Sequence, residues 1–139
     1  MPLYFAYGRL MNVDEMKKRC VSAKPLGTAT LEGFQFIVTK EGAPSVLKQP
    51  GAVTHGVLWD CRIGEIGIID GNEALFRRGQ DKVLLNVRCD GMSRKALVYI
   101  SLNRQKGRAQ AKAFDPVLPA AEHWNFPAIY RAHLESFTK

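Results

Sequence analysis

The chain has 139 residues, of which 46% are hydrophobic and 24% are charged. This size and composition predict one globular domain, residues 1–139, that buries a core without metals or disulfides. The three cysteines are odd in number, far apart and without a C-x-x-C pair, so neither a disulfide framework nor a structural zinc site is expected.

The formal net charge of +7 brings a nucleic-acid partner into consideration, because clustered Lys and Arg bind phosphates by releasing counterions. Here the basic residues are spread along the chain and do not alternate with aromatic residues, which argues against this partner. A basic nucleic-acid-binding barrel is kept only as a third hypothesis. The first residues carry no basic leader and only a short apolar run, so we expect no signal peptide, no membrane span and a cytoplasmic location.

The first predicted elements are a short strand and a short helix. An apolar run over residues 3–7 ends at Gly8 and predicts a strand followed by a turn. Asn12 is a good N-cap for a helix over 12–20, with Glu15 placed three residues on as in a capping box. A strand that passes through a glycine into a capped helix leaves backbone N–H groups for a carboxylate or an oxyanion. On spacing alone, an ordinary strand–turn–helix corner explains the same residues.

The next segment is rich in β-branched and aromatic residues. Lys24 to Thr39 predicts two strand segments with a bend or bulge at Gly33. A short strand over 44–48, a turn at Pro50-Gly51 and a strand over 55–60 follow.

The second half of the chain predicts helices around a hairpin. Isoleucines at helical spacing predict a short helix between Arg62 and Asp70. Strands over 83–87 and 96–100 are joined by Asp90-Gly91, a frequent hairpin dipeptide. A basic loop and then a helix broken at Pro127 complete the chain. Five to six or more short strands with peripheral short helices predict an α+β fold built on a small, mixed, partly open β-barrel.

Common catalytic signatures do not occur in the sequence. It lacks the phosphate-loop, dinucleotide, H-E-x-x-H and G-x-S-x-G patterns. The three histidines are scattered, with no Cys or His at ligand spacing beside them, so no metal site is expected.

Glu73 has two interpretations from its local sequence. The spacing Asp70-x-x-Glu73 fits a helix N-cap with its reciprocal glutamate. Alternatively, apolar residues on both sides would desolvate the carboxylate and raise its pKa toward neutrality, as a general acid/base requires.

Five segments occur in the order and approximate spacing of the γ-glutamyl cyclotransferase-like superfamily, which includes the AIG2-like proteins. They are Tyr4-Phe5-Ala6-Tyr7-Gly8, Leu31-Glu32-Gly33-Phe34, Gly51 through His55-Gly56-Val57-Leu58-Trp59, Ile69-Asp70-Gly71-Asn72-Glu73 and Ala96-Leu97-Val98-Tyr99. The chain resembles this superfamily over nearly its whole length.

The resemblance implies a small barrel with a cavity at one end, where a loop holds a γ-glutamyl group and a glutamate transfers protons. Carried over by position, the catalytic residue is Glu73, and the substrate-binding residues are Tyr7, Gly8, Arg9, Leu10, Met11 and, at the rim or in the core, Tyr99. The implied activity is release of 5-oxoproline from a small γ-glutamyl substrate in glutathione metabolism, without a cofactor, by a monomer or homodimer.

The loop departs from the pattern of the superfamily at two positions. Many members have Tyr-Gly-Ser-Asn-Met, and others have Tyr-Gly-Thr-Leu, whereas this chain has Arg9 and Leu10 after Gly8. Arg9 would either bind the substrate α-carboxylate or pair with Glu73 and lower its pKa. The alternative function is therefore a catalytically altered or inactive member that binds a small ligand or a protein partner.

Overall fold

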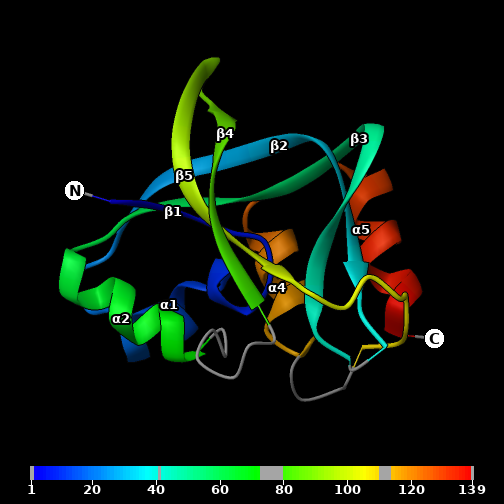
Figure 1. Ribbon diagram of the computed structural model, residues 1–139, viewed down its shortest axis with the longest axis horizontal. Helices are drawn as coiled ribbons and strands as arrows, with labels where there is room; N and C mark the ends of the chain where they lie inside the picture. Colours follow the sequence, from blue (N-terminus) through cyan, green and yellow to red (C-terminus); the bar gives the residue numbers. More distant parts are fainter. Residues whose placement is uncertain (1, 41, 73–79, 110–113, 139) are drawn as a thin grey trace.

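The computed structural model describes residues 2–40, 42–72, 80–109 and 114–138 (Figure 1). The described strands form a closed barrel in the order β1-β3-β2-β4-β5. Their bounds are Leu3–Ala6, Lys24–Val38, Pro44–Asp60, Gln80–Cys89 and Met92–Ser101 for β1 to β5. β1 runs antiparallel to β3 and parallel to β5. The predicted mixed barrel is confirmed, but it is closed and not partly open, because β1 pairs with both β3 and β5.

Short helices surround the barrel, as the α+β prediction requires. They are α1 (Val13–Arg19), α2 (Ile63–Asn72), α4 (Val117–His123) and α5 (Ala128–Glu135), with 3₁₀ turns η1 (Arg9–Met11) and η3 (Ser136–Thr138). α1 contacts α2, and α4 contacts both α5 and η1 (Figure 1). None of the helices in the described ranges is long and apolar enough to cross a membrane.

The long β2–β3 pair confirms one prediction and corrects another. The register shifts between Glu32 and Phe34, and Gly33 has a φ of 82°, so the predicted bulge is present. The predicted turn at Pro50-Gly51 is wrong, because β3 runs continuously from Pro44 to Asp60. Gly51 does have a positive φ of 84°, but it lies in the irregular stretch of β3 opposite Gly33 and not in a turn.

The predicted β4–β5 hairpin, the N-cap of α1 and the helix break at Pro127 are confirmed. Asp90 and Gly91 both have positive φ, 52° and 76°, as a two-residue type I′ connection between β4 and β5 requires. The Asn12 side chain accepts hydrogen bonds from the N–H groups of Asp14 and Glu15, at 3.1 and 3.2 Å, and so caps α1. Pro127 stands at the N-cap of α5 and separates it from α4.

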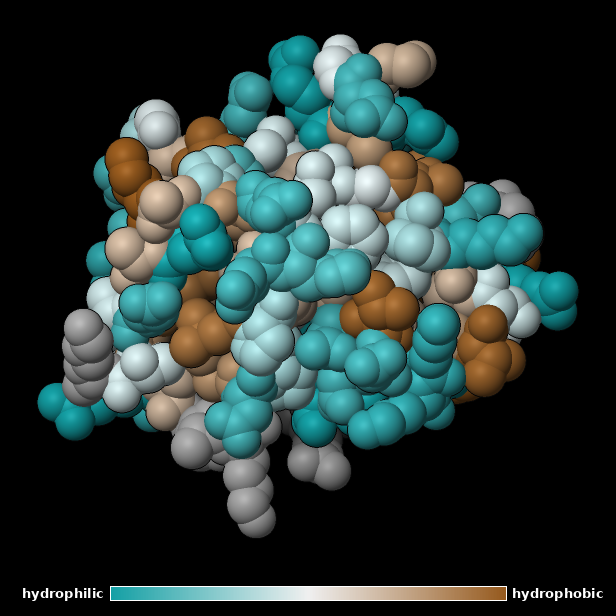
Figure 2. Space-filling view, turned by 180° about the vertical axis from the view of Figure 1, so that it is seen from behind, coloured by the Kyte–Doolittle hydropathy of each residue, from teal (hydrophilic) through white to brown (hydrophobic). Residues whose placement is uncertain are grey.

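The core contains apolar side chains from all five strands. Phe5, Phe36 and Trp59 are almost completely buried. Seen from behind, the surface is mainly hydrophilic, with hydrophobic side chains in small separate patches (Figure 2). Burial of the core side chains removes their apolar surface from water, which is the main driving force for folding.

The three thiols belong to this core. Cys20, Cys61 and Cys89 are buried and free. Burial raises the pKa of all three, and that of Cys61 to about 12. Because the thiolate is the reactive form, we expect a thiol reagent at about pH 8 to leave the native protein unmodified and to modify all three cysteines in denaturant. Rapid labelling of the native protein, measured by intact mass, would contradict this burial.

Candidate active site

Tyr7 and Tyr99 are predicted site residues from distant parts of the sequence, and the fold brings them together. Tyr7 directly follows β1, and its hydroxyl donates a hydrogen bond to the backbone carbonyl of Tyr99 in β5. The Tyr7 ring is buried and packs edge-on against Phe36. The start of the Tyr7 loop is therefore fixed to the neighbouring strand β5.

Tyr99 also connects this loop to the end of α2. Its hydroxyl donates to a carboxylate oxygen of Asp70, and Lys82 Nζ donates to both Asp70 oxygens at 3.0 and 3.1 Å. Lys82 stands directly opposite Tyr99 in the β4–β5 register, which places both side chains on one face. A chain of polar contacts thus runs from Lys82 through Asp70 and Tyr99 to Tyr7.

Asp70 has a different role from the one its spacing suggested. It lies in the last turn of α2 (Ile63–Asn72), not at the start of a helix, so its interpretation as an N-cap is wrong. It is a buried carboxylate that holds α2 against β4 and β5. Glu73 follows three residues later and lies outside the described residues.

Replacing Asp70 by Asn is expected to lower the free energy of unfolding by about 2 kcal/mol, because Lys82 loses its carboxylate partner in a largely buried setting. Urea denaturation measures this loss. The matched control is Asp81→Asn, which removes an exposed carboxylate from the adjacent position in β4. Equal stabilities of the two variants would show that the Asp70–Lys82 contact contributes nothing.

The remaining residues of the loop fold as a 3₁₀ turn with two buried side chains. Leu10 and Met11 are completely buried, and Trp124 Nε1 donates to the Met11 carbonyl at 2.8 Å. Any contact of these two residues with a substrate would therefore come from their backbone. The N–H groups of Arg9 and Leu10 meet no acceptor within the described ranges, whereas the N–H of Met11 donates to the Gly8 carbonyl at 3.1 Å.

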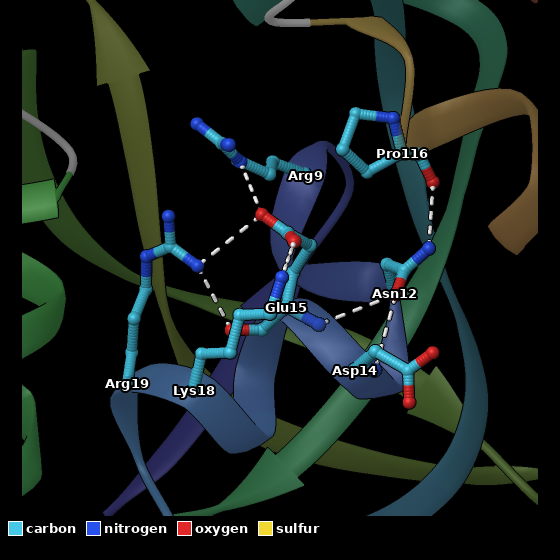
Figure 3. Close-up of polar contacts among 7 residues, drawn as sticks. All are labelled: Arg9, Asn12, Asp14, Glu15, Lys18, Arg19 and Pro116. Carbon is cyan, nitrogen blue, oxygen red and sulfur yellow. Dashed lines mark hydrogen bonds and ion pairs between the residues drawn. The ribbon is translucent and has the colours of Figure 1, made fainter.

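Arg9 pairs with a residue that neither sequence alternative named. Its Nε donates to Glu15 Oε1 at 2.7 Å (Figure 3). Glu15 also pairs with Lys18 at 3.2 Å and with Arg19 at 3.3 Å. The capping-box role of the Glu15 side chain is wrong, because the N–H of Asn12 instead donates to the Arg9 carbonyl. Whether Arg9 also meets Glu73 is outside the described residues.

The hydrogen bond from Arg9 lowers the pKa of Glu15 below its ordinary value of 4.5, against the opposing effect of burial. A carboxylate with a lowered pKa contributes stability above its unfolded pKa, and this contribution is lost as the pH falls through the folded pKa. Glu15→Gln should therefore be less stable than the wild type at about pH 7, by about 1 kcal/mol since two of the cations are exposed.

The difference should disappear in acid, well below the ordinary pKa of Glu15, where both proteins carry a neutral side chain at this position. Thermal unfolding across this pH range, repeated at high salt to screen the ion pairs, measures it. A constant difference at all pH values would show that the charge of Glu15 is not what stabilises α1.

The described residues contain no group of three or more His, Cys, Asp or Glu side chains that could hold a metal ion. His55 packs on Tyr130 with ring centroids 4.6 Å apart, and His133 lies within hydrogen-bond distance of the Phe36 carbonyl. These two histidines are part of the packing between α5 and the barrel.

The family described as gamma-glutamyl cyclotransferase, AIG2-like, matches residues 4–126. A solved structure titled gamma-glutamyl cyclotransferase has a TM-score of 0.88 at 18% identity, over 98% of this chain and 87% of that one. No curated protein matches the chain significantly.

Two further solved structures are also similar to this chain. An uncharacterized protein from Homo sapiens has a TM-score of 0.87 at 19% identity, over 97% of this chain and 86% of that one. An AIG2-like protein from Mus musculus has a TM-score of 0.61 at 22% identity, over 73% of this chain and 78% of that one. At these identities the structures establish the fold. The match over residues 4–126, with a closed barrel of the same fold, shows that the chain belongs to the gamma-glutamyl cyclotransferase, AIG2-like family.

Proposed function

We propose that the protein is a γ-glutamyl cyclotransferase that releases 5-oxoproline from a small γ-glutamyl compound. The observation that carries the proposal is the family match over residues 4–126, which contains the Tyr7 loop and position 73. We propose further that it acts as a single domain in the cytoplasm, in glutathione metabolism. A fold alone does not define a reaction, so the proposal depends on the residues of the site.

The proposed reaction rearranges bonds within one substrate. The α-amino nitrogen attacks the γ-carbonyl carbon and forms the bond that closes a five-membered ring. The bond between this carbon and the leaving nitrogen then breaks. The proton lost by the attacking nitrogen is delivered to the leaving nitrogen, so atoms and charge balance without water, metal or redox partner.

One carboxylate can perform both proton transfers, and we assign this role to Glu73. Tyr7 is proposed to fix the loop that holds the γ-glutamyl group, a role supported by its contact with the Tyr99 carbonyl. The N–H groups of Arg9 and Leu10 are proposed to stabilise the oxyanion of the tetrahedral intermediate. Because attack occurs within one molecule, holding the folded-back conformer supplies much of the acceleration.

The proposal is tested by incubating the wild-type protein with a panel of γ-glutamyl dipeptides and γ-glutamyl amines and measuring 5-oxoproline. We expect product above the spontaneous rate from at least one member. Absence of product from every member would contradict it. A γ-glutamyl analogue that raises the melting temperature without any turnover would instead favour the binding function.

A further inference from the structure

Glu15 holds the Nε side of the Arg9 guanidinium group, whereas the outer end of this group meets no acceptor among the described residues. Its Nε is used by Glu15 Oε1 at 2.7 Å, and its side chain is 42% exposed. No acceptor within the described ranges approaches its two terminal nitrogens. In Figure 3 these nitrogens point away from Glu15 and from Pro116. Two parallel N–H groups in this arrangement match the geometry of a carboxylate.

The surroundings of Arg9 favour an anion. Arg9, Lys18 and Arg19 all pair with one carboxylate, Glu15, which leaves an excess of two positive charges. Glu15 itself is only 13% exposed, whereas Lys18 is 70% exposed. Thus the negative charge lies mostly beneath the surface and part of the positive charge faces solvent. Such an arrangement attracts anions at a distance comparable to the Debye length.

The direction of the loop indicates which end of a substrate this charge would meet. Tyr7 points inward, where it is buried and bound to β5. Arg9, two residues later, leaves the loop toward α1 and solvent. In a γ-glutamyl compound the glutamyl half has to be held in a folded-back conformer for ring closure, whereas the leaving half takes no part in the new ring. The inner side of the loop therefore suits the glutamyl half, and the Arg9 side suits the leaving half.

We infer that Arg9 is a specificity-determining residue that binds a carboxylate on the leaving half of the substrate. The preferred substrates are then γ-glutamyl amino acids and peptides with a free carboxylate, rather than γ-glutamyl amines. This inference rests on the proposed cyclotransferase function. Glu15 acts as a positioning residue, since its contact with Nε fixes the direction of the guanidinium group.

The test uses a matched pair of compounds, γ-glutamyl-alanine and γ-glutamyl-alaninamide, which differ only in the charge of the leaving half. We expect the wild type to prefer the acid in kcat/KM by about tenfold, as for a partly exposed charge-assisted contact. Arg9→Gln should reduce the ratio of the two kcat/KM values to about 1, mainly by lowering kcat/KM for the acid. Lys17→Gln, which removes an exposed cation of α1 outside the cluster, should keep the preference.

A binding measurement separates failure of this inference from failure of the proposed function. Affinities of the acid and the amide for the Glu73→Gln variant, with and without Arg9→Gln, are measured by calorimetry. Tighter binding of the acid that depends on Arg9 supports the inference even if no protein gives 5-oxoproline. Equal affinities, or a preference that survives Arg9→Gln, would overturn it even if the wild type is active.

Discussion

Replacing Glu73 by Gln is expected to slow 5-oxoproline release by about 1000-fold, within the range that general acid/base groups contribute. The amide has the size of the carboxylate but neither accepts the proton of the attacking nitrogen nor returns it to the leaving nitrogen. Ring closure would then depend on the loop alone. The measurement is the initial rate of 5-oxoproline formation from the best substrate of the γ-glutamyl panel.

The matched control for this variant is Glu135→Gln, which neutralises an exposed glutamate at the end of α5. It should retain the wild-type rate, and both variants should keep the wild-type melting temperature within a few degrees. If Glu73→Gln and Glu135→Gln release 5-oxoproline equally fast, Glu73 is not the proton-transfer group.

Gly56→Ala is expected to destabilise the protein by at least about 3 kcal/mol, because the added methyl group has no space. A Cβ atom at this position would lie 2.4 Å from the carbonyl oxygen of Ala6 and 2.7 Å from the Phe5 ring. Both neighbours belong to β1, which pairs with β3 at this point. Relief of the overlap would push β1, and the Tyr7 loop that follows it, away from the barrel.

Urea denaturation of Gly56→Ala measures this effect, with Gly64→Ala as the control. Gly64 lies in α2, and no atom comes within 4 Å of an added Cβ. Alanine at this position should leave the free energy of unfolding unchanged or raise it by about 0.5 to 1 kcal/mol, because alanine has a higher helix propensity than glycine. A Gly56→Ala protein as stable as the wild type would show that β1 and β3 are not packed as closely as described.

The parts of the fold that the sequence predicts correctly are determined by residues that are close together in the chain. Asn12 caps α1 through N–H groups two and three residues away. Asp90-Gly91 fits the hairpin because both residues take a positive φ. Gly33 likewise permits its own bulge. In each case the residues that determine the conformation lie within a few positions of one another, so a local pattern is sufficient.

The features that were predicted wrongly, or not predicted at all, depend on contacts between residues that are distant in the sequence. Pro50-Gly51 has the composition of a turn, but pairing with β2 on both sides of it keeps the segment inside β3. Asp70 has the spacing of a cap, but Lys82 and Tyr99, 12 and 29 residues away, determine its role. The contact of Lys82 with Asp70 could be predicted only from the β4–β5 register, which places Lys82 opposite Tyr99. Arg9 likewise needed the turn of η1 to bring it to Glu15.

The most direct test of the proposed reaction distinguishes ring closure from hydrolysis of the same bond. The substrate is a γ-glutamyl dipeptide labelled with ¹⁵N at the α-amino group, and its products are followed by nitrogen NMR with an enzyme-free control. Cyclisation predicts that the label appears in the ring of 5-oxoproline, in equal amount to the released amino acid. Labelled free glutamate as the product, or an unchanged substrate, would contradict the cyclotransferase assignment.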